Sequence, residues 1–180
     1  GALSYRKIDL APRGVRAGAL EASRPRSPAA DIGLRLEDQP PTRHHLRLHG
    51  DGQRLSQLFR NLLRNSLQYT DAGGELRIGL SLASGRAEAV AAAASPSPSP
   101  TEGRGPDWLV IDFQDSAPGV PEEALGHLFE RLYRVDASRA RHSGGAGLGL
   151  AIARNIATAH GGDIAAHPSP LGGLWIRLRL

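Results

Sequence analysis

Two asparagines four residues apart are the first residues whose type and spacing could do chemistry. Asn61 and Asn65 fall on one edge of a segment with helical periodicity, and Gln68 and Tyr69 follow one turn later. Asparagine is a mediocre helix former, so two inside a helix cost on the order of a few tenths of a kcal/mol each. An amide oxygen can bind Mg²⁺, a hard cation that prefers oxygen ligands. Taken alone, the same spacing also fits a polar, solvent-exposed helix edge.

A second candidate is the sequence DSAPG at residues 115–119, directly after a predicted strand. The carboxylate of Asp115 could accept a hydrogen bond from an exocyclic amine. Gly119 would let the backbone approach a flat ring closely, because glycine has no side chain. An ordinary turn rich in Asp, Pro and Gly is the alternative.

A third candidate is the glycine-rich sequence GGAGLGL at residues 144–150, which precedes a predicted helix. Successive glycines expose backbone N–H groups, and a helix N-terminus adds partial positive charge, so phosphate binding is natural there. A flexible hinge is the alternative. The segment is no Rossmann fingerprint, because Leu150 stands where the last glycine should be. The chain has no Gly-Lys dipeptide for a Walker loop, and its one lysine, Lys7, cannot supply the strand lysine of a eukaryotic-type kinase.

The two asparagines need a helix to hold them, and the apolar pattern predicts one. Asp51 is suited to its N-cap, and the helix should continue to Tyr69. The positions recurring at helical spacing form a broad stripe that should face a core; they are Leu55, Leu58, Phe59, Leu62, Leu63 and Ser66.

The other candidates need strands before them and helices beside them. Further helices are predicted over residues 11–23, 121–133 and 147–160, the last ending at Gly161 and Gly162. Alternating apolar residues predict strands at residues 32–36, 46–48, 75–83, 108–114, 163–167 and 174–180, the last two as a hairpin. The sum is a mixed sheet covered on one face by helices, a two-layer α/β sandwich.

Three segments are predicted to lie outside this framework. Residues 1–7 have the character of a short helical tail or linker, and residues 84–107 of a low-complexity, disordered loop between two neighbouring strands. Residues 134–145 are polar, rich in arginine and flexible. We therefore expect a tail at residues 1–10 and one domain at residues 11–180.

Composition excludes several classes of protein. The 180 residues suit one domain, and no apolar stretch approaches the ~20 residues of a membrane span, so we expect a soluble chain. The absence of cysteine excludes disulfides and thiolate chemistry. The net charge is +4, but the arginines are scattered, which favours solvated faces over a nucleic-acid patch.

Taken together and in this order, the motifs resemble those of the ATP-binding catalytic domain of bacterial sensor histidine kinases, in the GHKL superfamily. Residues 57–70 resemble its N box, residues 115–119 its first glycine box, residues 128–134 its F box and residues 145–150 its second glycine box. The similarity is greatest to kinases of the envelope-stress type. Four ordered motifs are highly specific, and the resemblance implies the Bergerat ATP-binding fold.

The resemblance also implies a role for each candidate residue. Asn65 would hold Mg²⁺ against the phosphates of ATP, and Asn61 would support it from the previous turn. Tyr69 would pack along the adenine, and Asp115 would accept from its amine. The remaining nucleotide contacts, with residues 134–145 as a mobile lid, would come from Gln68, Gly119, Arg131, Arg134, Arg139, Gly145, Gly147, Leu148 and Gly149.

The chain departs from the family pattern at three positions. Gln68 stands where the family often has Lys or Arg, which removes a cationic phosphate contact that an arginine near the lid could replace. Ala117 replaces a glycine, and Ala146 replaces Thr or Ser. Nucleotide affinity could be lower as a result, but Asn65 and Asp115 are both present.

The activity implied is transfer of the γ-phosphoryl group to histidine. Related ATPases place a glutamate one turn before the metal asparagine to activate water, and here that position is Asn61, which has no useful basicity near pH 7. Catalysis would then depend on positioning and charge neutralisation. The implied partners are ATP, Mg²⁺, the phosphoacceptor histidine helices of the same kinase and a response regulator receiver domain. The implied location is the cytoplasmic side of the bacterial inner membrane, in a membrane-anchored homodimer.

None of the seven histidines lies in the family's acceptor pattern, so the chain alone is not expected to autophosphorylate. Three alternatives stay open: a nucleotide-binding or protein-interaction module without phosphotransfer, a hydrolysing ATPase of the same superfamily, and nucleic-acid binding through the arginines.

Overall fold

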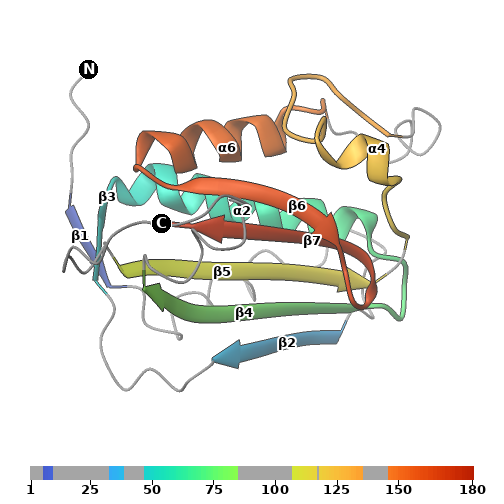
Figure 1. Ribbon diagram of the computed structural model, residues 1–180, viewed down its shortest axis with the longest axis horizontal. Helices are drawn as coiled ribbons and strands as arrows, with labels where there is room; N and C mark the ends of the chain where they lie inside the picture. The colour runs from blue at the N-terminus through green and yellow to red at the C-terminus, as the bar shows by residue number, and fades with distance from the viewer. Residues whose placement is uncertain (1–5, 10–32, 39–46, 85–106, 117, 136–145) are drawn as a thin grey trace, which may run out of the picture.

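The protein folds into two layers, a five-stranded sheet and two helices that cover one of its faces (Figure 1). The computed structural model describes residues 6–9, 33–38, 47–84, 107–116, 118–135 and 146–180. In chain order the elements are β1 (Arg6–Asp9), β2 (Gly33–Asp38), β3 (Arg47–Gly50), α2 (Gly52–Tyr69), β4 (Glu75–Ser84), β5 (Asp107–Ser116), α4 (Glu122–Leu125), α6 (Gly149–Ala159), β6 (Asp163–Pro168) and β7 (Gly172–Arg179). The predicted two-layer α/β sandwich is confirmed.

The sheet is mixed, as predicted, with strand order β2-β4-β5-β7-β6. Strands β2 and β4 are parallel, and the other three pairings are antiparallel. The β4–β5 pairing runs from Leu76 opposite Asp115 to Ser84 opposite Asp107. The low-complexity segment therefore joins two neighbouring strands, as expected from the sequence.

Helix α2 follows the predicted bounds and packs its leucine stripe against the sheet. The Asp51 carboxylate caps it by accepting from the N–H groups of Gln53 at 2.9 Å and Arg54 at 3.2 Å. Leu58 and Leu62 are fully buried, and each such side chain stabilises the fold by about 1.5–3 kcal/mol. The core also contains Leu55, Leu63, Ile78, Ile111, Phe113, Ile156, Ile176 and Leu178.

Helix α6 lies beside α2 on the same face and ends as the glycine pair predicts (Figure 1). Gly161 is left-handed with φ 77°. Its N–H donates to the Thr158 carbonyl, and the Gly162 N–H donates to the Ala157 carbonyl, both at 3.0 Å. These two bonds form a Schellman motif, which satisfies carbonyls that the helix end leaves open.

The prediction of one helix from Pro121 through Tyr133 was wrong. Helix α4 ends at Leu125, and the chain then continues in tight turns. The N–H groups of His127 and Glu130 each donate to a carbonyl three residues earlier, at 3.0 and 2.9 Å. Three-residue bonds wind the backbone more tightly than an α-helix, so the segment changes direction before it reaches Tyr133.

Two boundaries also differ from the sequence predictions. Residues 6–9 form β1, paired antiparallel with β3, and do not continue the helical tail predicted for residues 1–7. A partner some 40 residues away along the chain leaves no trace in local periodicity. Asp115 and Ser116 belong to β5, and not to the predicted turn, because β5 stays paired through them. The predicted helix at residues 11–23 lies outside the described residues.

His160 joins the end of α6 to the start of α2. Its Nδ1 lies 2.8 Å from the Ile156 carbonyl, which can only accept, so Nδ1 carries the hydrogen. Its Nε2 is then free to accept from the Asp51 N–H at 3.0 Å. A Cβ on Gly50 would lie 2.7 Å from His160 Cδ2 and 2.8 Å from Leu55 Cδ1, so the imidazole fills the space left by the glycine. Among the described residues, no helix is both long and apolar enough to cross a membrane.

We expect Gly50→Ala to lower the free energy of unfolding by about 1–3 kcal/mol, because the added methyl group overpacks this joint. Gly79→Ala is the matched control: it also lies in a strand, but its Cβ would meet nothing closer than Asp112 Cβ at 3.8 Å. Urea denaturation of the two variants measures the difference. Equal stability of both would show that the His160 joint tolerates a side chain at Gly50.

Candidate functional site

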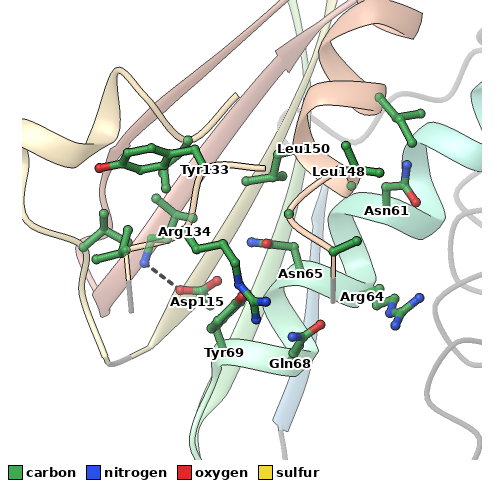
Figure 2. Close-up of a pocket in the computed structure, with 18 of the residues that line it drawn as sticks. Asn61, Arg64, Asn65, Gln68, Tyr69, Asp115, Tyr133, Arg134, Leu148 and Leu150 are labelled. Carbon is green, nitrogen blue, oxygen red and sulfur yellow. Dashed lines mark hydrogen bonds between the residues drawn. The ribbon is translucent and has the colours of Figure 1, made fainter. Parts of the chain in front are cut away.

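A cavity of about 570 Å³ lies between the C-terminal half of α2, the ends of β5 and β7, and the segments on either side of residues 136–145. It is the place where the sequence motifs meet (Figure 2). The predicted site residues that line it are Asn61, Asn65, Gln68, Tyr69, Asp115, Gly119, Arg134, Gly147, Leu148 and Gly149. Arg139 and Gly145 lie outside the described residues.

The edge of α2 supplies one wall of the cavity. Asn61, Asn65 and Gln68 project from successive turns, as their spacing predicts (Figure 2). Asn61 Nδ2 and Gln68 Nε2 are buried and have no hydrogen-bond partner in the described part of the chain. A buried donor without a partner costs about 1–3 kcal/mol, so a ligand that offers acceptors here would gain that energy.

Asp115 forms the base of the cavity and is only 3% exposed. It follows Ile111 and Phe113 on the core face of β5, where alternation would place another apolar residue. The Leu174 N–H donates to Asp115 Oδ1 at 2.6 Å. A Cβ on Gly173 would collide with that same oxygen, so the close approach of β7 requires glycine there.

Burial raises the pKa of Asp115 from 3.8 to about 6. Desolvation is the main cause, because it penalises the charged carboxylate. The Leu174 N–H lowers the pKa in part, and so does the nearby Ser66 hydroxyl, which lies outside good hydrogen-bonding geometry. The site therefore holds a carboxylate that titrates close to physiological pH.

Glycine backbone forms the opposite wall. Gly147 is left-handed with φ 67°, and α6 begins two residues later, at Gly149. The sequence predicted the helix start at Gly147, but a left-handed residue cannot belong to an α-helix. Gly147, Leu148 and Gly149 all line the cavity at this helix N-terminus, where backbone N–H groups and the helix dipole favour an anion.

Among the described residues, two arginines line the cavity, and one of them was predicted. Arg134 reaches into it, and its Nη2 is buried with no partner among the described residues (Figure 2). Arg131, which the sequence also favoured, is exposed and does not line the cavity. Arg64 does line it and was missed, although it lies three residues after Asn61 and four before Gln68 on the same helix.

The described residues do not build a metal site from protein ligands alone. They contain no cluster of three or more His, Cys, Asp or Glu side chains that could hold a metal ion. The amide oxygens of Asn61 and Asn65 are nevertheless hard donors at the cavity wall. This donor set suits Mg²⁺ that takes its other ligands from phosphates and water.

The chain is similar in sequence to known proteins. A sequence model of the family described as "Histidine kinase-, DNA gyrase B-, and HSP90-like ATPase" matches residues 50–180. The signal transduction histidine-protein kinase BaeS of Escherichia coli (strain K12) is 43% identical over 100% of this chain, which covers 33% of that relative. The sensor protein SphS of Synechococcus elongatus is 37% identical over 74% of this chain and 29% of its own length. The chain thus spans a third or less of these relatives.

Solved structures share the fold at lower identity. The catalytic domain of histidine kinase ThkA superposes with a TM-score of 0.70 at 18% identity, covering 99% of this chain and 95% of that one. The mycobacterial sensor histidine kinase MprB gives 0.66 at 21% identity, covering 99% and 97%. The fold is therefore that of histidine kinase catalytic domains.

The family match includes every described residue that lines the cavity, and this family consists of ATPases, which implies ATP binding. The chain belongs to the histidine kinase-, DNA gyrase B- and HSP90-like ATPase family.

Proposed function

We propose that this chain is the ATP-binding catalytic domain of a two-component sensor histidine kinase. It binds Mg-ATP and transfers the γ-phosphoryl group to a histidine on a helical domain of the same kinase. One observation carries the proposal: a single cavity combines a buried carboxylate at its base, an amide-bearing helix edge on one wall and glycine backbone at a helix N-terminus on the other.

The carboxylate end of the cavity suits adenine. The Leu174 N–H engages Asp115 Oδ1, which leaves Oδ2 to accept from the exocyclic amine. Val120 and Leu150 line the cavity as apolar surfaces for a flat ring, and Tyr69, 38% exposed, lies along its mouth. Adenine bound here would be recognised by one strong hydrogen-bond acceptor, Asp115, and by burial of its ring against apolar side chains.

The opposite end suits a triphosphate with its metal ion. Asn65 would contribute its amide oxygen to Mg²⁺, and Asn61 would support it from the preceding turn. Bound Mg²⁺ would supply charge neutralisation to the phosphates. The phosphate oxygens would accept hydrogen bonds from the N–H groups at Gly147 and Gly149 and from the guanidinium of Arg134.

The same residues favour transfer to a protein nucleophile over hydrolysis. Of the described residues that line the cavity, Asp115 is the one carboxylate, and none is a histidine. Asp115 lies at the end of the cavity proposed for adenine, away from the phosphates, and the amide of Asn61 has no useful basicity. These residues therefore offer no general base that could activate water beside the γ-phosphate.

The rest of the kinase is proposed from the relatives. Their names describe sensor proteins and histidine-protein kinases. The expected boundary after residue 10 moves toward the N-terminus, because β1 pairs with β3 and so belongs to the catalytic domain. The residues before β1 would then be the linker and tail of the dimerisation and phosphoacceptor helices. A response regulator receiver domain would take the phosphoryl group from the histidine. The parent protein would be a membrane-anchored homodimer with this domain on the cytoplasmic side.

A second candidate function is a nucleotide-binding or protein-interaction module of the same fold without phosphotransfer. It is favoured by Gln68, which brings a neutral amide to the cavity wall, and by Ala146, which brings no hydroxyl. Nucleotide binding and phosphotransfer are therefore tested separately.

We expect the chain to bind Mg-ADP, and Asn65→Ala to weaken that binding roughly tenfold or more, because a charge-stabilising ligand is worth about 1–3 kcal/mol. Removing Mg²⁺ with a chelator should weaken the wild type to the level of the variant. Asn155→Ala is the matched control, since Asn155 is an exposed helical asparagine outside the cavity. Calorimetric titration measures all four affinities, and equal affinity of Asn65→Ala and wild type would remove Asn65 from the metal.

We expect no phosphoryl transfer when the chain alone is incubated with γ-labelled ATP. Adding the separate phosphoacceptor helices of the BaeS relative should produce acid-labile label on those helices. Label on any of the seven histidines of this chain would contradict the first expectation. Binding of nucleotide without any transfer to added helices would favour the interaction module.

We expect nucleotide affinity to fall as the pH drops through about 6, to roughly one tenth at pH 5, because protonation of Asp115 at Oδ2 turns the oxygen that faces the adenine amine into a donor. Asp115→Asn should bind weakly and lose this component of the pH profile. The same variant should gain roughly 1–3 kcal/mol of stability at pH 7.5, since the raised pKa means that ionisation of the buried carboxyl destabilises the native state progressively from the ordinary pKa of 3.8 and in full above about 6. If the wild type and Asp115→Asn showed the same dependence of affinity on pH, Asp115 would not bind the adenine amine.

A further inference from the structure

We propose that Leu132 is a positioning residue whose left-handed backbone turns the chain so that Arg134, and not Arg131, enters the nucleotide cavity. The inference rests on the proposed function, because it takes the ligand of that cavity to be a nucleotide. Leu132 lies within the F-box segment, residues 128–134, but was not among the predicted site residues and does not line the cavity.

The conformation of Leu132 is unusual for its residue type. Its φ is 65°, and it is the one non-glycine residue with positive φ among the described residues. The Cβ makes this region unfavourable for every residue except glycine and, to a lesser degree, Asn and Asp. Leu132 is 68% exposed, so packing of its side chain does not hold the backbone there.

A backbone lock holds the turn instead. The Leu132 N–H donates to the Gly147 carbonyl at 3.0 Å. Gly147 is itself left-handed, and a Cβ on it would lie 3.1 Å from Leu132 Cα and 3.2 Å from the Tyr133 carbonyl oxygen. The two left-handed residues therefore meet backbone to backbone, one on each side of residues 136–145. This contact fixes the end of the F-box segment against the start of the glycine wall.

The turn decides which arginine faces the ligand. Arg131, just before it, is exposed and outside the cavity lining. Arg134, just after Tyr133, lines the cavity and has a buried Nη2 without a partner in the described part of the chain (Figure 2). A guanidinium nitrogen in that state is unfavourable unless an anion reaches it, and a planar fork suits phosphate oxygens. The backbone conformation of Leu132 thus directs the Arg134 guanidinium to the place where the phosphates of the nucleotide would lie.

Substitutions at Leu132 separate backbone preference from side-chain chemistry. Leu132→Ile keeps the size and apolarity but adds β-branching, which strongly disfavours positive φ. We expect it to bind a non-hydrolysable Mg-ATP analogue roughly fivefold to twentyfold more weakly, with little change in melting temperature. Leu132→Asn and Leu132→Gly lose the apolar side chain but accept positive φ, and should bind within about twofold of the wild type.

A double-mutant cycle tests the route through Arg134. In an Arg134→Ala background, Leu132→Ile should cause no further loss of affinity, because there is no longer a cation to misplace. Equal loss in both backgrounds, or wild-type affinity of Leu132→Ile, would overturn the proposal. Should Leu132→Ile not fold, weak binding by Leu132→Asn and Leu132→Gly would overturn it as well. Failure of the proposed function is distinguishable, because the wild type itself would then bind no nucleotide.

Discussion

The carboxylate of Asp115 lies where the alternation of β5 should place a hydrophobic side chain, and the cavity is arranged around that exception. The residues two and four positions earlier, Phe113 and Ile111, are core residues on the same face. A charge in this position is tolerated because β7 comes close enough for the Leu174 N–H to reach it. That approach in turn requires the missing side chain of Gly173. The register of β5 and β7, the glycine at position 173 and the buried Asp115 carboxylate therefore depend on one another.

The position of α2 follows from the same sheet. Its leucine stripe is buried over the core strands, so the edge beside the stripe must lie at the rim of the layer. Asn61 and Asn65 are on that edge and line the cavity, and Asn65 lies nearer to Asp115 than Asn61 does (Figure 2). Replacing the stripe would move the amides away from the carboxylate, although neither asparagine contributes to the core. Packing and function are thus coupled through the geometry of one helix.

Much of this arrangement was predictable, and the failures have physical reasons. Periodicity identifies α2, the hairpin β6–β7 and the glycine end of α6, because each is specified by residues close in sequence. Strand β1 was missed since its partner β3 is distant along the chain. The helix predicted through Tyr133 fails because tight turns replace it, and those turns include the strained residue Leu132. At Leu132 the backbone violates the preference of a leucine for negative φ, close to Arg134, which enters the cavity. Such violations are common at functional sites.

Several buried polar groups of the cavity have no partner within the described part of the protein, and a ligand can supply one to each. Asn61 Nδ2, Gln68 Nε2 and Arg134 Nη2 are buried without partners in the described part of the chain, and Asp115 is a desolvated acid beside them. A buried donor that stays unpaired opposes folding by about 1–3 kcal/mol, and none of the four groups improves the packing of the core. A ligand that presents phosphate acceptors to the donors and an amine to the carboxylate satisfies all of them at once. Nucleotide binding should therefore stabilise this domain strongly, since the ligand compensates interactions that the protein alone leaves unmade.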